Sequence, residues 1–396
     1  MTLTYDAVVV GGGPAGATAA ADLARAGRHV LLLDRAGRIK PCGGAIPPRL
    51  IRDFAIPDHL LVARATAARM ISPSNRVVNM PIEGGFVGMV DRDVFDEWLR
   101  VRATQAGAER TSGTFQRIER DADGVAVVCF NEKGAPKDSV QRVRTRTVIG
   151  ADGARSQVAR QAIRGADRMP CVFAYHEIIR SPAPGEMDFE ASRCDIYYQG
   201  KLSPDFYAWI FPHGDTASIG VGSANKGFSL RSAVTALRDI SGLAGCETVR
   251  TEGAPIPLKP LPRWDNGRDV VLAGDASGVV APASGEGIYY AMVGGRVAAE
   301  AVETFLATGR ASSLAMARKT FMRAHGKVFW ILGIMQHFWY RSDKRRERFV
   351  KMCDDPDVQR LTWQAYMNKE LVRANPGAHM RIFFKDMGHL LGVSSP

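Results

Sequence analysis

The chain has 396 residues, of which 46% are hydrophobic and 23% are charged, and this composition excludes a disordered, a collagen-like or a disulfide-stapled miniature protein. Of its formal net charge of +11, the last 87 residues carry +9, from 16 basic and 7 acidic side chains, so we expect an anionic neighbour there. The longest apolar runs, such as residues 328–335, are far shorter than the roughly 20 residues that cross a bilayer.

The first 34 residues show the pattern of a strand, a helix and a second strand of a parallel sheet. Apolar runs predict buried strands over residues 6–10 and 30–34, and the Ala-rich stretch 15–26 predicts a helix closed by Gly27. The chain enters the first strand without a leader-like pattern, and its six cysteines form no CxxC pair. A reducing cytoplasm is therefore the expected compartment.

The turn between the first strand and the helix reads GGGPAG, with glycines at GxGxxG spacing. Such a turn brings backbone N–H groups and a helix N-terminus close to a pyrophosphate, and an acid at the end of the next strand can accept hydrogen bonds from a ribose. The pattern predicts a bound dinucleotide; the alternative is a structural turn in a fold that has lost its ligand. The expected contacts are Gly11, Gly13, Pro14, Ala15, Gly16, Asp34 and Arg35.

Further along the chain, strand and helix patterns alternate without an internal repeat. Residues 171–262 are rich in aromatic, β-branched and turn residues, as in an antiparallel sheet. The other expected elements are a Gly/Pro-rich loop at 40–49, alternating segments at 68–90, a helix at 91–106, strands near 125–130, 147–150 and 270–275, a helix at 287–307, and helices after 311. The nucleotide domain is therefore expected to be discontinuous, with the antiparallel sheet inserted between its parts.

Two later segments repeat the pattern of a buried strand followed by Gly and Asp. VIGADGARSQVAR at 148–160 and VVLAGDASGVVAPASGEGI at 270–288 bring Asp152 and Asp275 to the same sheet edge, where ligands of α/β folds collect. Three such segments indicate a long ligand. The alternative for each acid is a helix cap or a surface turn.

With these three segments the sequence resembles the FAD-dependent family that includes aromatic-ring hydroxylases and geranylgeranyl reductases. The resemblance implies that Asp275 touches the ribityl chain and that GEGI at 285–288 lies near the flavin ring. It also implies that Arg92 lies near the FAD phosphates. Because only one GxGxxG is present, NADPH would visit an open groove, or another reductant would serve. The implied flavin loop is Gly285, Gly287 and Ile288, and the implied groove between FAD and NADPH is Asp152, Gly153 and Arg155.

Two motifs narrow the resemblance to the geranylgeranyl reductase family. They are PCGGA at 41–45 and YAWIFP at 207–212, the second followed by Gly220-Val221-Gly222. KPCGGAIP at 40–47, MISPSNRVVN at 70–79 and FVGMVDRDVFDEWLR at 86–100 resemble the chlorophyll and bacteriochlorophyll branch. The tail after residue 310 offers no motif that can be matched. The resemblance implies an NADPH- and FAD-dependent reductase that saturates three of four double bonds in a geranylgeranyl group, on bacteriochlorophyll or on the free diphosphate.

Side-chain alternation in a strand places Tyr207, Trp209 and Phe211 on one face, as an aromatic wall for an isoprenoid; the alternative is a face packed on the core. An isolated alkene does not accept hydride directly, so we expect protonation first and a tertiary cation that aromatic faces stabilise by about 0.5–2 kcal/mol each.

Cys42 is one candidate proton donor, because Gly43, Gly44 and Ala45 let its loop approach the flavin. Tyr207 and His213 are alternatives, with His213 expected to be a solvated turn residue.

The predicted fold class is α/β, a Rossmann-like FAD-binding domain with an inserted antiparallel-sheet substrate domain and a helical C-terminal region. The predicted parts are FAD-binding segments at 1–67, 91–165 and 265–310, substrate-domain segments at 68–90 and 166–264, and a C-terminal region at 311–396. The basic, aromatic stretch 337–352 is either a membrane-interface helix or a core-packed helix with a solvated face. We expect peripheral contact with a photosynthetic membrane and predict neither a metal site nor nucleic-acid binding.

A reductase of other prenyl lipids, a flavin monooxygenase and a non-catalytic prenyl carrier on the same fold stay open as alternative functions.

Overall fold

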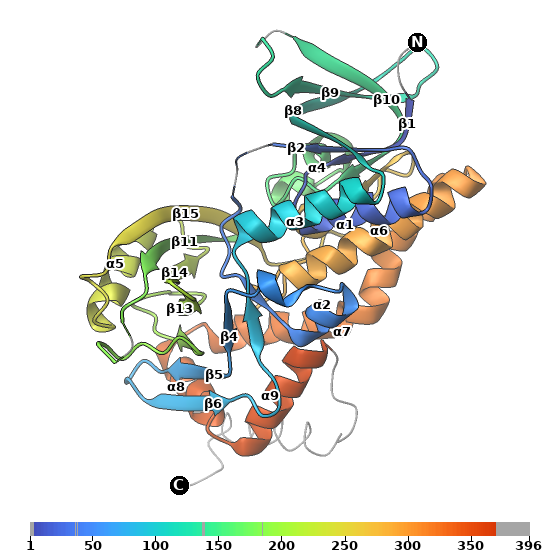
Figure 1. Cartoon of the computed structure of the whole chain (residues 1–396). Coiled ribbons are helices and arrows are strands. Elements are labelled where there is room, and N and C mark those ends of the chain that lie inside the picture. Colours follow the sequence, from blue (N-terminus) through green and yellow to red (C-terminus); the bar gives the residue numbers. More distant parts are fainter. Residues whose placement is uncertain (1–3, 36, 38, 137–138, 184, 370–396) are drawn as a thin grey trace.

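The structure is a computed structural model, and it describes all residues except 1–3, 36, 38, 137–138, 184 and 370–396. Two large sheets lie side by side, and helices cover one side of the first sheet and close the second (Figure 1). This arrangement confirms the predicted fold class, a Rossmann-like domain with an inserted sheet and a helical C-terminal region.

The first sheet has a parallel core built around β1 (Thr4–Val10). β1 pairs with β2 (Val30–Asp34) on one side and with β10 (Val140–Gly150) on the other, and β16 (Val270–Leu272) pairs with β10. β8 (Glu109–Arg120) adds parallel to β2, and β9 (Ala126–Glu132) pairs antiparallel with both β8 and β10. β1, β10 and β16 therefore end together at one edge of the sheet, as their sequence motifs predicted.

Three helices pack on this sheet in one layer. α1 (Pro14–Arg25) lies between α3 (Arg92–Gln105) and α6 (Ile288–Thr308) (Figure 1). The Ala-rich sequence of α1 allows this close packing, and ten of its twelve residues are buried. A shorter helix, α4 (Gln157–Ala162), follows the end of β10.

The second sheet has seven strands in the order β15, β11, β14, β13, β12, β5, β6. Its pairings are antiparallel except that between β12 and β5. α5 (Leu230–Ile240) covers one face, with Val234 and Leu237 buried against it. The strands are β5 (Ala67–Ile71), β6 (Val77–Pro81), β11 (Cys171–Arg180), β12 (Arg193–Tyr197), β13 (Ala208–His213), β14 (Thr216–Ser223) and β15 (Thr248–Pro257).

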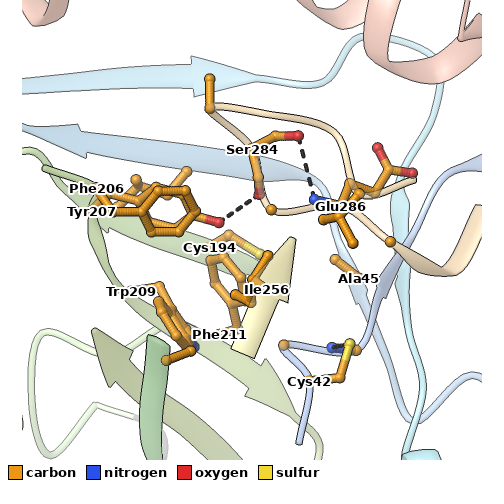
Figure 2. Close-up of a pocket in the computed structure, with 18 of the residues that line it drawn as sticks. Cys42, Ala45, Cys194, Phe206, Tyr207, Trp209, Phe211, Ile256, Ser284 and Glu286 are labelled. Carbon is orange, nitrogen blue, oxygen red and sulfur yellow. Dashed lines mark hydrogen bonds between the residues drawn. The ribbon is translucent and has the colours of Figure 1, made fainter. Parts of the chain in front are cut away.

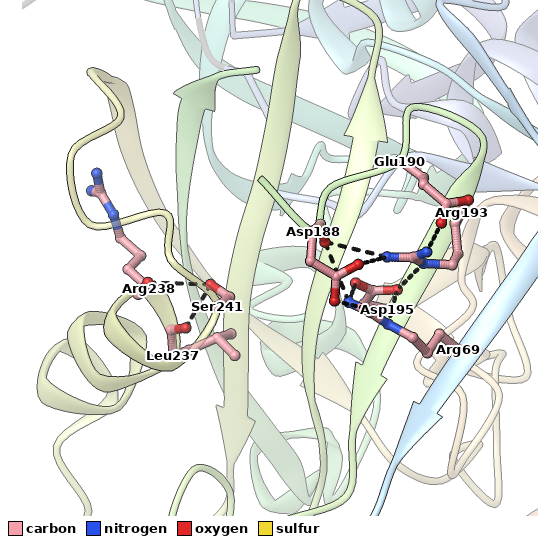
Figure 3. A network of polar contacts seen from close by, with 8 residues as sticks. All are labelled: Arg69, Asp188, Glu190, Arg193, Asp195, Leu237, Arg238 and Ser241. Carbon is pink, nitrogen blue, oxygen red and sulfur yellow. Dashed lines mark hydrogen bonds and ion pairs between the residues drawn. The ribbon is translucent and has the colours of Figure 1, made fainter. Parts of the chain in front are cut away.

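A network of ion pairs fixes the loop before β12 on that same face (Figure 3). The carboxylate of Asp195 is buried and contacts the guanidinium groups of both Arg69 and Arg193, with an Arg193 Nε to Oδ1 distance of 2.8 Å. Asp188 and Glu190 of the loop contact the same arginines from outside. Alternation along β5 and β12 keeps these paired charges on one face and leaves the other face apolar.

The remaining elements close the far side of the second sheet. α7 (Met316–Trp339), α8 (Asp343–Met352) and α9 (Pro356–Asn368) form the end of the described chain, and no described helix is long and apolar enough to cross a membrane. A small sheet of β3 (Ala45–Ile46), β7 (Val87–Met89) and β4 (Ala63–Ala65) joins the two large ones. The short helices are α2 (Pro48–Asp53), η1 (Asp58–Leu60), η2 (Ala166–Arg168), η3 (Gly274–Ser277) and η4 (Ala311–Ala315).

The aromatic and basic stretch 337–352 packs into the core. Trp339, Tyr340 and Phe349 are buried beside Tyr198 of the second sheet, and the Arg346 guanidinium donates to backbone carbonyl oxygens, including that of Ser203 at 3.1 Å. Of the two interpretations of this stretch, the core-packed helix with a solvated basic face therefore describes the structure.

Candidate active site

Two cavities adjoin where the two large sheets meet. One is an apolar cavity of about 310 Å³ between the second sheet and helices α7 and α9. The other is a larger groove of about 870 Å³ along the carboxyl ends of β1, β2 and β10. Residues common to both walls include Pro14, Lys40, Arg92, Asp275 and Ala291, so the cavities open into each other.

The glycine turn forms one end of the groove. Gly11 has φ of +109°, and a Cβ there would overlap the Ala151 carbonyl oxygen, so only glycine fits between β1 and β10. A Cβ on Gly13, by contrast, would meet no atom within 4 Å. The turn therefore leaves open space in front of the N-terminus of α1, where Pro14 and Ala15 also line the groove. This is the cradle that a dinucleotide pyrophosphate requires.

The adenosine end of the groove lies at the end of β2. The Asp34 carboxylate accepts a hydrogen bond from the Gly12 N–H at 3.1 Å and lies 3.4 Å from Arg100 Nη1. Asp34 and the exposed Arg35 both line the groove. The carboxylate is thus held at the position where the sequence pattern expects a ribose.

Asp152 lines the groove, but its carboxylate caps α4. It accepts hydrogen bonds from the Gln157 N–H at 2.7 Å and from the Ser156 hydroxyl. Burial raises the pKa of this carboxyl group. The helix-cap alternative therefore describes the carboxylate, while Gly153 and Arg155 also line the groove.

Two buried charges stand where the cavities meet. Asp275, in η3 directly after β16, forms an ion pair with Lys40. Arg92, the first residue of α3, donates from Nε to Asp96 at 2.8 Å and from Nη2 at 2.7 Å. Although burial disfavours its charge, the Asp96 carboxylate and the Cys42 thiol raise the pKa of Arg92. Arg92 is therefore a permanent buried cation beside Cys42.

The CGG loop packs onto the aromatic strand. A Cβ on Gly43 would lie 3.0 Å from the Phe211 ring, and one on Gly44 would lie 2.5 Å from His213 Nε2. The Gly44 N–H points to Cys42 Sγ at 3.4 Å, and Cys42 and Ala45 both line the apolar cavity (Figure 2). The two glycines thus let Cys42 reach the cavity wall opposite the aromatic residues.

The expected aromatic wall is present. The ring centroids of Tyr207 and Trp209 lie 5.9 Å apart and those of Trp209 and Phe211 lie 6.2 Å apart, and all three rings line the apolar cavity (Figure 2). The Tyr207 hydroxyl donates to the Ser284 carbonyl oxygen at 2.6 Å. This bond ties the aromatic wall to the 285–288 loop, in which Gly285, Gly287 and Ile288 also line the cavity.

The glycines of the GxG motif make room for this wall. Trp209 and His176 are both register partners of Gly220, and a Cβ on Gly220 would overlap the Trp209 ring and lie 2.6 Å from His176 Cβ. A Cβ on Gly222 would lie 2.7 Å from the Phe206 ring. The motif therefore lets aromatic side chains lie flat across β14.

Sequence reasoning missed a polar network behind Trp209. Trp209 Nε1 donates to Ser218 Oγ at 3.1 Å, Ser218 Oγ lies 2.9 Å from His176 Nδ1, and His176 Nε2 lies 3.0 Å from Glu252. These residues share a face of the second sheet, because they alternate correctly along β11, β13, β14 and β15. The network fixes the orientation of the indole.

A second missed pair lies at the helical side. Glu286 and Lys369 form a buried ion pair, and Lys369 also lies 3.6 Å from the Tyr366 ring centroid. Burial raises the pKa of Glu286 and lowers that of Lys369. The pair joins the end of α9 to the 285–288 loop. No sequence motif signals it, because a contact 83 residues apart depends on the tertiary fold.

The structure separates the candidate proton donors. His213 is buried, contrary to the expected solvated turn residue, because the CGG loop covers it. Burial lowers the pKa of His213 to about 4, and His213 is not among the described residues that line the cavity. The Tyr207 proton is directed to a backbone carbonyl, and burial raises the Tyr207 pKa. Cys42 lines the cavity, and its Sγ accepts the Gly44 N–H at 3.4 Å.

Comparison with known proteins gives consistent matches. Residues 9–57 match the model of an NAD(P)-binding Rossmann-like domain. A geranylgeranyl diphosphate reductase of Rhodobacter capsulatus is 59% identical over 100% of this chain and 99% of its own length. One of Synechocystis is 37% identical, with 97% of each chain covered, and a digeranylgeranylglycerophospholipid reductase of Methanoculleus marisnigri is 32% identical over 95% of this chain and 96% of its own.

Solved structures share the fold. A geranylgeranyl bacteriochlorophyll reductase-like protein of Thermoplasma acidophilum superposes with a TM-score of 0.80 at 22% identity, covering 95% of this chain and 99% of its own. A flavin-dependent brominase superposes with a TM-score of 0.74 at 17% identity, covering 98% and 100%.

We predict that Gly220→Ala displaces the Trp209 ring, because the new methyl group and the indole cannot occupy the same space. The expected results are an altered near-ultraviolet circular dichroism spectrum and a loss of about 1–3 kcal/mol in the free energy of unfolding. Gly227→Ala is the control, since its Cβ would meet only Asn225 Oδ1 at 3.6 Å. Equal spectra and stabilities for the two variants would contradict the packing role of Gly220.

Proposed function

The chain belongs to the geranylgeranyl reductase family, and from this premise we propose that it saturates three of the four double bonds of a geranylgeranyl group with NADPH as the reductant. The observation that carries the proposal is the junction of the dinucleotide groove with an apolar, aromatic-walled cavity. The cavity volume of about 310 Å³ is at the lower end of the range for small-molecule sites.

The groove has the donors and the shape that FAD requires. The open space before α1 fits the pyrophosphate, Asp34 fits the adenosine ribose, and Asp275 with Lys40 is placed for the polar chain leading to the ring. FAD, when bound, supplies the hydride. The contribution of this chain is to hold the ring end of the cofactor where the groove meets the prenyl cavity.

The cavity walls protect an alkene that develops positive charge. An isolated double bond gains a proton more readily than a hydride, and the resulting tertiary cation would react with any water present. Tyr207, Trp209 and Phe211 exclude water and present ring faces, each able to contribute about 0.5–2 kcal/mol of cation–π attraction. The hydrogen bond from Trp209 to Ser218 keeps the indole from turning.

Cys42 is the proton donor in this proposal. The thiol lies on the cavity wall, and the buried Arg92 beside it stabilises the thiolate that remains after proton transfer. The Gly44 N–H, 3.4 Å from Sγ, adds a second stabilising group. In this proposal the negative charge therefore stays on the Cys42 sulfur until another proton reaches it.

The substrate in this proposal is geranylgeranyl diphosphate or the geranylgeranyl ester of bacteriochlorophyll. Two of the relatives described above are named for geranylgeranyl diphosphate and the third for a phospholipid with geranylgeranyl chains, and these names support a geranylgeranyl group as the part that is reduced. The described cavity has a long apolar wall from α7 and α9, including Leu332, Met335 and Trp363. Such a wall suits the geranylgeranyl group that both substrates contain.

We further propose that α7 rests on an anionic membrane surface. Trp330 and Ile334 are 69% and 49% exposed on the side of α7 that faces away from the cavity. Exposed Arg323 and Lys327 precede them at helical spacing on the same side. An exposed aromatic residue beside basic ones fits the headgroup region, and Leu332 of the same helix lines the prenyl cavity.

The first test is anaerobic incubation of the flavin-loaded protein with NADPH and either substrate, followed by mass analysis. We expect products that have gained two hydrogens at a time, to a total of three additions. A protein that binds FAD but leaves both substrates unchanged would overturn the proposed reaction. Oxygen consumption in proportion to NADPH oxidation would indicate a monooxygenase instead.

Cys42→Ser should lower the rate of alkene reduction about 10²- to 10⁴-fold, because a hydroxyl is a much weaker acid than a thiol. FAD content should stay normal. Cys194→Ser is the matched control: Cys194 lines the same cavity, but burial raises the pKa of its thiol to about 12. If both variants keep the wild-type rate, Cys42 is not the donor.

Trp330→Ser should weaken sedimentation with vesicles that contain an anionic lipid, because it removes the largest exposed apolar group of α7. Val94→Ser, at a residue 56% exposed on α3, should sediment like the wild type. Equal sedimentation of all three proteins would show that α7 is not the contact surface.

A further inference from the structure

Strand β11 borders both cavities. Ala174 and His176 line the apolar cavity, while the side chains of Phe173 and Tyr175 line the groove, which Ala174 also borders. Side chains alternate between the faces of a strand, so this division follows from the backbone. The groove therefore has two aromatic rings, the exposed Phe173 and the half-buried Tyr175, that the prenyl cavity does not share.

An arginine lies over each of these rings. The Arg155 guanidinium carbon is 5.9 Å from the Phe173 ring centroid, and that of Arg231 is 5.6 Å from the Tyr175 ring centroid. Because Phe173 and Tyr175 are two residues apart on one face of β11, the two guanidinium groups lie over neighbouring rings. Both arginines are exposed.

Within the described part of the chain, neither guanidinium has a carboxylate within ion-pair distance. Arg155 lines the groove and Arg231 follows the lining residue Leu230, whereas the groove residues Arg92 and Arg100 are both paired. Arg231 also stands in the first turn of α5, whose N-terminus carries the positive end of the helix dipole. This part of the groove thus combines two positive charges with aromatic surfaces on which a base can stack.

We propose that Phe173, Tyr175, Arg155 and Arg231 form the docking site of the reductant, a nicotinamide dinucleotide with an additional ribose phosphate. This inference deepens the proposed function, on which it rests. Guanidinium forks match phosphate oxygens, and exposed rings accept a stacked base. On this side of β11 the nucleotide reaches the junction at Asp275 without entering the prenyl cavity.

The choice of NADPH over NADH follows from the charges. The additional phosphate of NADPH carries close to two negative charges, and two unpaired guanidinium groups are present to meet it. In the hydride transfer that this site serves, NADPH gives two electrons and one proton as hydride to FAD and leaves as NADP⁺. The loss of one arginine should therefore weaken NADPH binding far more than NADH binding.

The test is titration of the flavin-loaded protein with NADP⁺ by calorimetry, without a prenyl substrate. We expect Arg231→Gln and Arg155→Gln each to raise the dissociation constant about tenfold and to reduce the preference over NAD⁺. Arg160→Gln, which removes an exposed charge of α4 outside the groove, is the control. FAD content and circular dichroism establish that each variant is folded.

Wild-type affinity in both Arg155→Gln and Arg231→Gln would overturn the site, and so would an equal loss in Arg160→Gln, because that result would mean a general charge effect. Failure of the wild type to bind NADP⁺ would also overturn it. The proposed function is tested separately, by reducing each protein with dithionite before adding geranylgeranyl diphosphate. If Arg231→Gln then reduces the substrate at the wild-type rate, the site serves the reductant alone.

Discussion

The site depends on close packing between a glycine strand and an aromatic strand. Because Gly220 and Gly222 have no side chains, the rings of Trp209 and Phe206 can lie across β14, and because Gly43 has none, the Cys42 loop can approach Phe211. With larger residues in place of these glycines, the aromatic side chains would have to turn away from the sheet and into the cavity. The absence of side chains at the glycines therefore keeps the cavity open for a prenyl chain.

Much of the fold and part of the site could be predicted from local patterns. The strand, glycine turn and helix over residues 4–25 and the acids after β10 and β16 are local in sequence, and the structure brings their segments to one sheet edge. The aromatic wall followed from alternation along a single strand. These features depend on neighbours within a few residues, so the sequence carries them directly.

Other features depended on contacts between distant segments. β8 was not expected, because its exposed polar side chains give almost no apolar alternation, and only Gly113 and Phe115 are buried. The network of His176 and Glu252 with Ser218 and Trp209 needs the register of four strands, and the burial of His213 needs the CGG loop to fold over it. The role of Asp152 as a helix cap competes with any direct contact between its carboxylate and a ligand, and the sequence alone could not choose between them.

The two-faced strand β11 has a consequence for the order of events. In the proposed reaction, a geranylgeranyl group with three double bonds to saturate needs three deliveries of electrons. With the proposed docking site on one face of β11 and the apolar wall on the other, a spent carrier can depart and a fresh one arrive while the partly reduced lipid stays in place. The proposed arrangement thus favours processive turnover, in which partly saturated intermediates are completed before they are released.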